Sequence, residues 1–326
     1  MTSPNPRLSI VIPTLVGGTQ LEDTLVSVLQ HRPESCEVLV AHSGCYDDPY
    51  DLGDEVRFVR TERGSSLATC ARSAVAEAKG EIVHLLASGV SVEEGWSDAA
   101  IARFDDLHIG AVAPLMLSSE ADAARSTIGV RYRAGGRRIE ATQPISRSPD
   151  RLRKRRIVGP HFSAAFYRRS AIELVGGIPC DVGDRLIDVD LGLTLKAAGF
   201  SVAAEPDCRV NITGKTATPR TGLVDGFYAE RVFWQNAGRR GWLRSLALHP
   251  FSVGLSLAGE LPHPASVLQL FGRLAGFLHW AIANRRHESP SIEAERAEPL
   301  ILSYEQRAEE PAVDEDHNAS SLRRSA

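Results

Sequence analysis

Two carboxylates stand at the start of one predicted helix and have the chemistry that proton transfer needs. Asp188 lies just before the apolar repeat of residues 189–198, and Asp190 falls in its first turn. A carboxylate is a suitable general base, because it takes a proton from an attacking hydroxyl. The same positions also suit structural roles, since Asp188 would cap the helix and Asp190 would interact favourably with the helix dipole. The spacing alone is compatible with both interpretations.

Two other stretches suit contact with an anion. Ser88 and Gly89 follow a predicted strand, where glycine lets backbone N–H groups approach a phosphate closely; a simple strand-ending turn is the alternative. Residues 151–156 (RLRKRR) hold five positive charges in six positions, which fits either a solvated basic loop or a loop that faces an anion. No G-x-G-x-x-G follows the first strand and no P-loop is present, which disfavours a dinucleotide-dependent dehydrogenase.

The elements that position these residues alternate between strands and helices. Such alternation is typical of a mostly parallel sheet with helices on its faces. Ligands bind such sheets outside the carboxyl ends of the strands, which is where Ser88 and Gly89 fall. The pattern weakens between residues 101 and 156. Apolar runs predict strands over 8–12, 37–41, 56–59, 82–86 and 201–204, and helical spacing predicts helices over 20–30, 66–79 and 189–198.

The composition is that of a globular protein. The 326 residues carry 37 Lys and Arg against 41 Asp and Glu, a net charge of −4, and 43% are hydrophobic. These values exclude a fibrous repeat and a wholly disordered chain, and they give no support for nucleic-acid binding. Five widely spaced cysteines without a C-x-x-C pair argue against a disulfide framework or a zinc site, and favour a cytoplasmic protein. Neither a signal peptide nor a transmembrane helix is predicted.

The C-terminal third differs from the rest of the chain. Residues 223–286 carry seven Lys and Arg against three Asp and Glu, in helices that look amphipathic. Such helices either pack on the main domain or attach to an anionic membrane surface, as a peripheral protein does at the inner face of a membrane. The last forty residues hold ten acidic and four basic side chains and predict a mobile tail. We therefore expect a main domain over 1–220, an amphipathic helical extension over 221–286 and a disordered acidic tail over 287–326.

Six segments of the main domain stand out: LSIVIPT (8–14), CEVLVAHSG (36–44), AEAKGE (76–81), FYRR (166–169), VGG (175–177) and IDVDL (187–191). Together these segments resemble family 2 glycosyltransferases of the GT-A fold. Their order and spacing over about residues 7–215 are more specific than any segment alone. The resemblance implies an α/β fold, with a Rossmann-like, mostly parallel sheet flanked by helices. It also implies a hexosyltransferase that moves a sugar from a nucleotide-diphospho-sugar to a saccharide or lipid-linked acceptor hydroxyl, usually with inversion, in polysaccharide or glycolipid synthesis.

The resemblance also implies roles for single residues. Asp188 matches the second acidic residue of the family's Glu-Asp pair, which implies a general base, and Asp190 would orient the acceptor. Thr14 lies where the family touches its nucleotide, and His42 matches the acidic residue that reads the nucleotide base. The donor-binding candidates are Thr14, His42, Arg72, Ser88, Gly89 and Lys215.

The chain departs from the family at the metal-binding motif. Ala87-Ser88-Gly89 stands at the Asp-x-Asp position and offers no carboxylate to a hard cation. No metal ligand is therefore assigned, and a Mn²⁺ or Mg²⁺ cofactor is doubtful. Two explanations compete. In one, a metal-independent transferase stabilises its leaving diphosphate with fixed cations such as Arg72, Lys215 or the run at 151–156. In the other, a degenerate member of the fold acts as a non-catalytic binding or scaffold protein.

Overall fold

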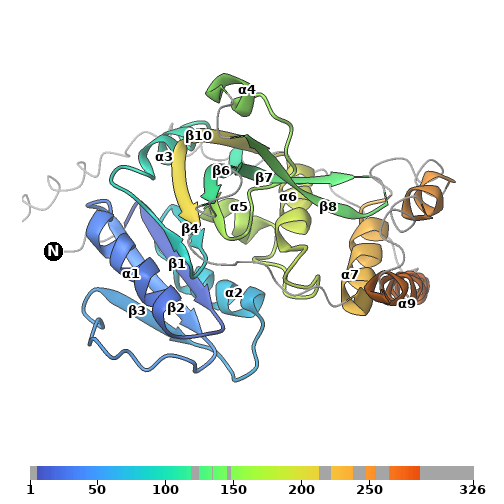
Figure 1. Ribbon diagram of the computed structural model, residues 1–326, viewed down its shortest axis with the longest axis horizontal. Coiled ribbons are helices and arrows are strands. Elements are labelled where there is room, and N and C mark those ends of the chain that lie inside the picture. The colour runs from blue at the N-terminus through green and yellow to red at the C-terminus, as the bar shows by residue number, and fades with distance from the viewer. Residues whose placement is uncertain are drawn as a thin grey trace, which may run out of the picture. The chain divides into compact units, whose positions relative to one another are not determined.

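The strands of the protein form one mixed sheet, seen in the computed structural model of Figure 1. The structure describes residues 6–118, 125–133, 135–144, 148–212, 222–237, 247–254 and 264–286. The chain divides into two units, Met1–Ile282 and Ala283–Ala326, and the contacts discussed below lie in the first.

The described residues give a ten-stranded sheet in the order β3-β2-β1-β4-β9-β6-β10-β5, with β7 paired to β6 and to β8. Strands β1 to β4 run parallel, whereas β9 runs antiparallel to both β4 and β6. The strands are β1 (Leu8–Thr14), β2 (Cys36–His42), β3 (Val56–Arg60), β4 (Ile82–Leu86), β5 (Val90–Ser91), β6 (Ile109–Ser118), β7 (Arg125–Arg133), β8 (Arg137–Pro144), β9 (Ala164–Arg168) and β10 (Ser201–Ile212).

Helices cover both faces of the sheet, and the alternation of side chains along β1 shows why. Val11 packs on one face into a core shared with α2, α5 and α6, while Ile10 and Ile12 pack on the other with α1 and α3. A strand that is buried on both faces is mostly apolar, and β1 is apolar except at Ser9 and Thr14. The helices are α1 (Thr19–His31), α2 (Leu67–Glu77), α3 (Asp98–Arg103), α4 (Pro149–Arg153), α5 (Arg169–Leu174), α6 (Ile187–Ala197), α7 (Gly222–Gln235) and α9 (Pro264–Arg286), and residues 247–254 are also helical.

The mostly parallel sheet flanked by helices confirms the fold class predicted from the sequence. Two predictions were incomplete. The weakly patterned stretch 101–156 contains α3, α4 and the three strands β6, β7 and β8. Strand β10 continues to Ile212 instead of ending at residue 204, through an irregularity at Glu205 where Arg103 and Arg153 hold the buried carboxylate. All five cysteines are free. The predicted acidic tail, 287–326, lies outside the described residues.

The C-terminal helices are joined by a buried polar cluster. The Glu230 carboxylate on α7 accepts hydrogen bonds from Trp234 Nε1 (2.7 Å) and from Arg273 Nη1 on α9 (3.0 Å), and lies 2.7 Å from His249 Nε2. The helix α7 also contacts the main sheet domain, because its Ala229 and Val232 belong to the same apolar core as α2 and α6. Among the described helices none combines the length and the apolar character needed to cross a membrane.

Candidate active site

The carboxyl ends of β1, β2 and β3 bring three polar residues into a row. The parallel register sets Thr14 beside His42 and His42 beside Arg60. The Thr14 hydroxyl is engaged in the turn that follows, donating to the Val16 carbonyl oxygen at 2.6 Å. Burial and the nearby Arg60 lower the pKa of His42, and its Nδ1 has no hydrogen-bond partner in the described part of the chain. The structure therefore joins two of the predicted donor-site residues and adds Arg60.

Ser88 and Gly89 lie at the end of β4, but the Gly89 amide does not point at an open site. It lies 3.0 Å from the Thr24 hydroxyl and 3.2 Å from the Gln20 carbonyl oxygen, both on α1. Gly89 also has a φ of 86°, which few residues other than glycine adopt without strain. The amide of Ala87, two residues before Gly89, donates to the Ser163 carbonyl oxygen at 2.8 Å. The segment is thus built as a tight turn against α1.

The residues at this position do not fit a divalent cation. Ala87-Ser88-Gly89 supplies no carboxylate, and the backbone amides of Ala87 and Gly89 point at protein oxygens. Over the described ranges, no group of three or more His, Cys, Asp and Glu side chains is arranged to hold a metal ion.

Asp188 lies in the first turn of α6, where a guanidinium from β8 holds its buried carboxylate. Arg138 Nε lies 3.0 Å from Oδ1 and 3.1 Å from Oδ2, and Arg138 Nη2 donates to Oδ2 at 2.7 Å. The side chain of Asp188 is only 2% exposed. It makes no capping hydrogen bond, because α6 begins one residue earlier, at Ile187. The structural alternative of a helix cap is therefore wrong for Asp188, which instead forms a buried ion pair.

Asp188 also lies close to the end of β4. The amide of Phe162 donates to Asp188 Oδ2 at 3.4 Å, and the next residue, Ser163, accepts the bond from Ala87. Two backbone contacts thus connect the candidate base to the position where the metal motif would stand.

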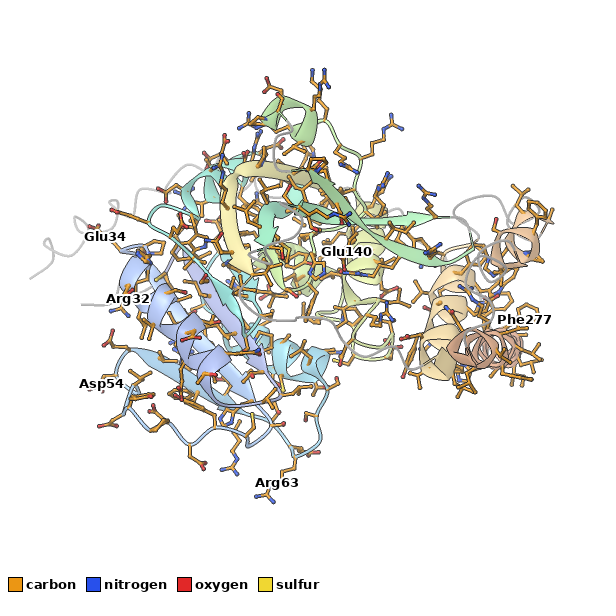
Figure 2. The ribbon with its side chains drawn as sticks, viewed as in Figure 1. Arg32, Glu34, Asp54, Arg63, Glu140 and Phe277 are labelled. Carbon is orange, nitrogen blue, oxygen red and sulfur yellow. The ribbon has the colours of Figure 1, made fainter. Side chains whose placement is uncertain are left out.

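Two further residues extend the ion pair toward solvent. Arg138 Nη1 donates to Glu140 Oε1 at 3.2 Å, and His161 Nε2 lies 3.5 Å from the same oxygen. His161 Nδ1 accepts the Ser163 amide, so the ring carries its proton on Nε2 and directs it at Glu140. These contacts lower the pKa of Glu140 to about 2, with the His161 hydrogen bond as the main cause. Burial alone would lower the pKa of Arg138, but the neighbouring carboxylates raise it above its ordinary value. Glu140, a residue of β8, is labelled in Figure 2.

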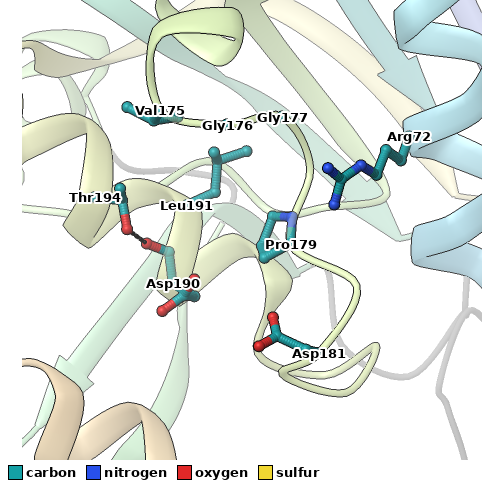
Figure 3. A pocket seen from close by; sticks show the side chains of 9 residues that line it. All are labelled: Arg72, Val175, Gly176, Gly177, Pro179, Asp181, Asp190, Leu191 and Thr194. Carbon is teal, nitrogen blue, oxygen red and sulfur yellow. Dashed lines mark hydrogen bonds between the residues drawn. The ribbon is translucent and has the colours of Figure 1, made fainter. Parts of the chain in front are cut away.

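A cavity of about 240 Å³ lies between α2, the loop after α5 and α6 (Figure 3). Arg72 of α2 lines one side, and Asp190 and Thr194 of α6 line another. Successive residues of a helix are turned by about 100°, so Asp190 faces this cavity while Asp188 faces Arg138. The structure therefore brings Arg72 and Asp190 to one cavity and separates both from Asp188. Lys215 lies outside the described residues.

Comparisons with known proteins identify the fold. No family model matches the sequence, and no curated protein sequence does. Among solved structures, GalNAc-T7 with UDP, GalNAc and Mn²⁺ superposes with a TM-score of 0.58 at 15% identity, over 87% of this chain and 58% of that one. The mannosyltransferase PcManGT from Pyrobaculum calidifontis, in complex with GDP-Man and Mn²⁺, gives 0.51 at 18%, over 88% of this chain and 90% of that one. S. aureus TarS 1–349 gives 0.58 at 14%, over 84% and 80%.

The chain has the GT-A fold. At these identities the likeness shows the fold and leaves the activity to be argued from the site. Of the site residues found in the GT-A-type sheet, Arg60 and Arg138 were not predicted. Arg60 directly follows the strand predicted over 56–59, and that position is the signal that would have pointed to it. Arg138 lies in the weakly patterned stretch 101–156, where no local signal marked it.

Proposed function

We propose that this protein is a glycosyltransferase that moves a sugar from a nucleotide-diphospho-sugar to the hydroxyl of a saccharide or lipid-linked acceptor. The fold is that of glycosyltransferases whose solved complexes hold UDP or GDP-Man. The observation that carries the proposal is the placement of an oriented carboxylate, Asp188, next to the carboxyl end of β4. Ligands of such sheets bind at that edge.

Asp188 is proposed as the general base of an inverting reaction. The base removes the proton from the acceptor hydroxyl, whose oxygen then attacks the anomeric carbon opposite the departing diphosphate. Of the two carboxylate oxygens, Oδ2 receives Arg138 Nε and Nη2 and the Phe162 amide, whereas Oδ1 receives Arg138 Nε alone. A carboxylate oxygen offers two lone pairs, so Oδ1 retains one for the acceptor proton.

Transfer is proposed to need no metal ion, because the residues at 87–89 offer no ligand for one. The negative charge that develops on the leaving diphosphate must then be stabilised by positively charged side chains. Arg60 at the end of β3 is exposed and makes no ion pair within the described part of the chain, so it is the proposed cation; Arg72 is exposed too, but it lines the cavity that is separated from Asp188. Guanidinium groups suit phosphate oxygens because they bind them with two parallel hydrogen bonds.

A second candidate, a non-catalytic binding protein on the same fold, is favoured by the burial of Asp188. A side chain that is 2% exposed and paired with Arg138 reaches an acceptor only if neighbouring groups move. In a binding protein the Arg138–Asp188 pair would serve only to hold β8 against α6.

The test is a transfer assay with UDP-, GDP- and dTDP-sugars, each with EDTA and with Mn²⁺, on wild type, Asp188→Asn and the matched variant Asp190→Asn. We expect turnover in EDTA, a loss of about 10²-fold or more for Asp188→Asn, and a much smaller loss for Asp190→Asn. Wild-type turnover by Asp188→Asn removes its role as base, and turnover only with Mn²⁺ overturns the metal-independent chemistry. A donor that raises the melting temperature without any turnover supports the binding protein instead.

A further inference from the structure

The helix α9 presents an apolar face that no part of the described chain covers. The only charged residue between positions 267 and 282 is Arg273, which is buried. At 100° per residue the exposed apolar side chains fall on one side of the helix and extend over about four turns. We call them the α9 face; they are 47% to 59% exposed and comprise Val267, Leu268, Leu270, Phe271, Leu274, Leu278 and Ile282. Side chains project from α9 around the labelled Phe277 in Figure 2.

The packing of the opposite side fixes this orientation. Gly272 and Gly276 lie against the α7 backbone, where a side chain at Gly272 would collide with the Leu223 carbonyl oxygen. Arg273 binds the buried Glu230, and Trp280 stacks on Trp234 with ring centroids 5.2 Å apart. Rotating α9 to bury its apolar face would break these contacts, so the face stays directed outward.

An apolar surface of this extent calls for a partner, since soluble proteins rarely expose contiguous apolar patches of several hundred Å². We infer that the α9 face docks on an anionic lipid surface, with the helix lying in the plane of the membrane interface. An amphipathic helix in a segment with an excess of Lys and Arg binds membranes in this way, and residues 223–286 have such an excess. Residues 247–254 add two more exposed apolar side chains, Leu248 and Phe251, the latter 72% exposed.

The distribution of charge selects the lipid surface over another copy of the chain. The described parts of the C-terminal helices hold two carboxylates, and both are paired: Asp225 with Arg185 at 2.8 Å and Glu230 with Arg273 at 3.0 Å. The sequence of α9 contains no acidic residue, and residues 223–286 carry seven Lys and Arg against three Asp and Glu. A second copy of this segment carries the same excess of positive charge, so two copies would repel each other. Anionic headgroups complement this positive charge.

If the proposed transferase activity holds, docking would bring the enzyme to a lipid-linked acceptor. The docking itself does not depend on that activity, so its test uses no sugar donor and fails or succeeds separately.

The experiment is flotation of the full chain with vesicles of phosphatidylcholine, alone or mixed with phosphatidylglycerol. Phe271→Glu/Leu278→Glu places two charges in the α9 face. The matched control, Val26→Glu/Leu107→Glu, makes the same charge change at two other exposed apolar positions, 54% and 61% exposed. We expect wild type and the control to float with the anionic vesicles, and the α9 variant to bind at least about tenfold more weakly. Added salt should weaken wild-type binding.

Three results would overturn the inference. Wild type that stays at the bottom of the gradient shows that the face does not bind lipid, and equal flotation with both vesicles removes the preference for anionic lipid. A wild-type dimer in sedimentation that Phe271→Glu/Leu278→Glu converts to a monomer, without flotation, assigns the face to a second copy. Equal melting temperatures of the two double variants ensure that a loss of binding is not a loss of folding.

Discussion

Replacing Arg138 by methionine would leave Asp188 buried without its cation. The carboxylate would lose contacts of 3.0, 3.1 and 2.7 Å and keep only the Phe162 amide at 3.4 Å. Removing one partner of a buried ion pair costs about 3–5 kcal/mol, because the remaining charge stays desolvated. Methionine preserves much of the aliphatic volume of arginine, so the effect reports on charge more than on packing.

We expect Arg138→Met to lower the free energy of unfolding by about 3 kcal/mol, the lower end of that range. The lower end applies because the Arg138 side chain is 16% exposed and water already reaches it. The matched control is Arg133→Met, on the same hairpin but exposed and without an ion pair in the described structure. Surface changes of that kind stay within about 0.5 kcal/mol.

Urea unfolding measures both variants, together with Asp188→Leu and the double variant Arg138→Met/Asp188→Leu. The double variant removes both charges and should regain most of the lost stability, because an apolar pair replaces a buried ion pair at little cost. The reasoning fails if Arg138→Met is no less stable than Arg133→Met. It also fails if the double variant shows the sum of the two single losses, since that additivity would mean that the groups do not interact.

Two further predictions concern the core and the C-terminal helices. His84 is fully buried against Phe166, and burial lowers its pKa to about 3. Below about pH 6.5 the unfolded state therefore binds a proton that the folded state does not. The free energy of unfolding then decreases as the pH is lowered, by up to about 1.4 kcal/mol per pH unit. Urea unfolding at about pH 5 and pH 7.5 should show a shallower fall for His84→Leu, and an unchanged fall would refute this assignment. Gly272→Ala should lower the melting temperature, at a cost of about 1–3 kcal/mol, because the new methyl group meets the Leu223 carbonyl oxygen; Gly254→Ala, with open space around it, is the control and should change little.

The elements that the sequence predicted well are those whose own residues determine their structure. The run at β1 is apolar except at Ser9 and Thr14 because the strand is buried on both faces, so its character is visible without knowing its neighbours. Strand β7 was missed for the opposite reason. It reads RSTIGVRYR, with three arginines and an internal glycine, and becomes a strand because β6 and β8 pair with it. Strand formation there depends on tertiary context more than on intrinsic preference.

In the candidate site, too, the positions of residues at the ends of strands and helices were predictable from the sequence, whereas contacts between distant residues were not. The register of parallel strands placed Thr14 beside His42, as expected of residues that end neighbouring strands. The position of Asp188 at the start of α6 was also predicted, but not its burial, which depends on a cation fifty residues away in sequence. A buried carboxylate needs such a partner, and the sequence contains 37 lysines and arginines to choose from.

The choice among those cations is made by the register of the β7–β8 hairpin. Arg137 and Arg138 are adjacent, and side chains alternate between the two faces of a strand. The pairing of Tyr132 with Arg138 turns Arg138 toward α6 and Asp188, and it turns Arg137, opposite Arg133, to the other face. A slip of one residue would exchange the two arginines, so the charge balance at Asp188 is a consequence of strand pairing. Because the proposed base depends on that balance, the hairpin is as much a part of the candidate site as α6 itself.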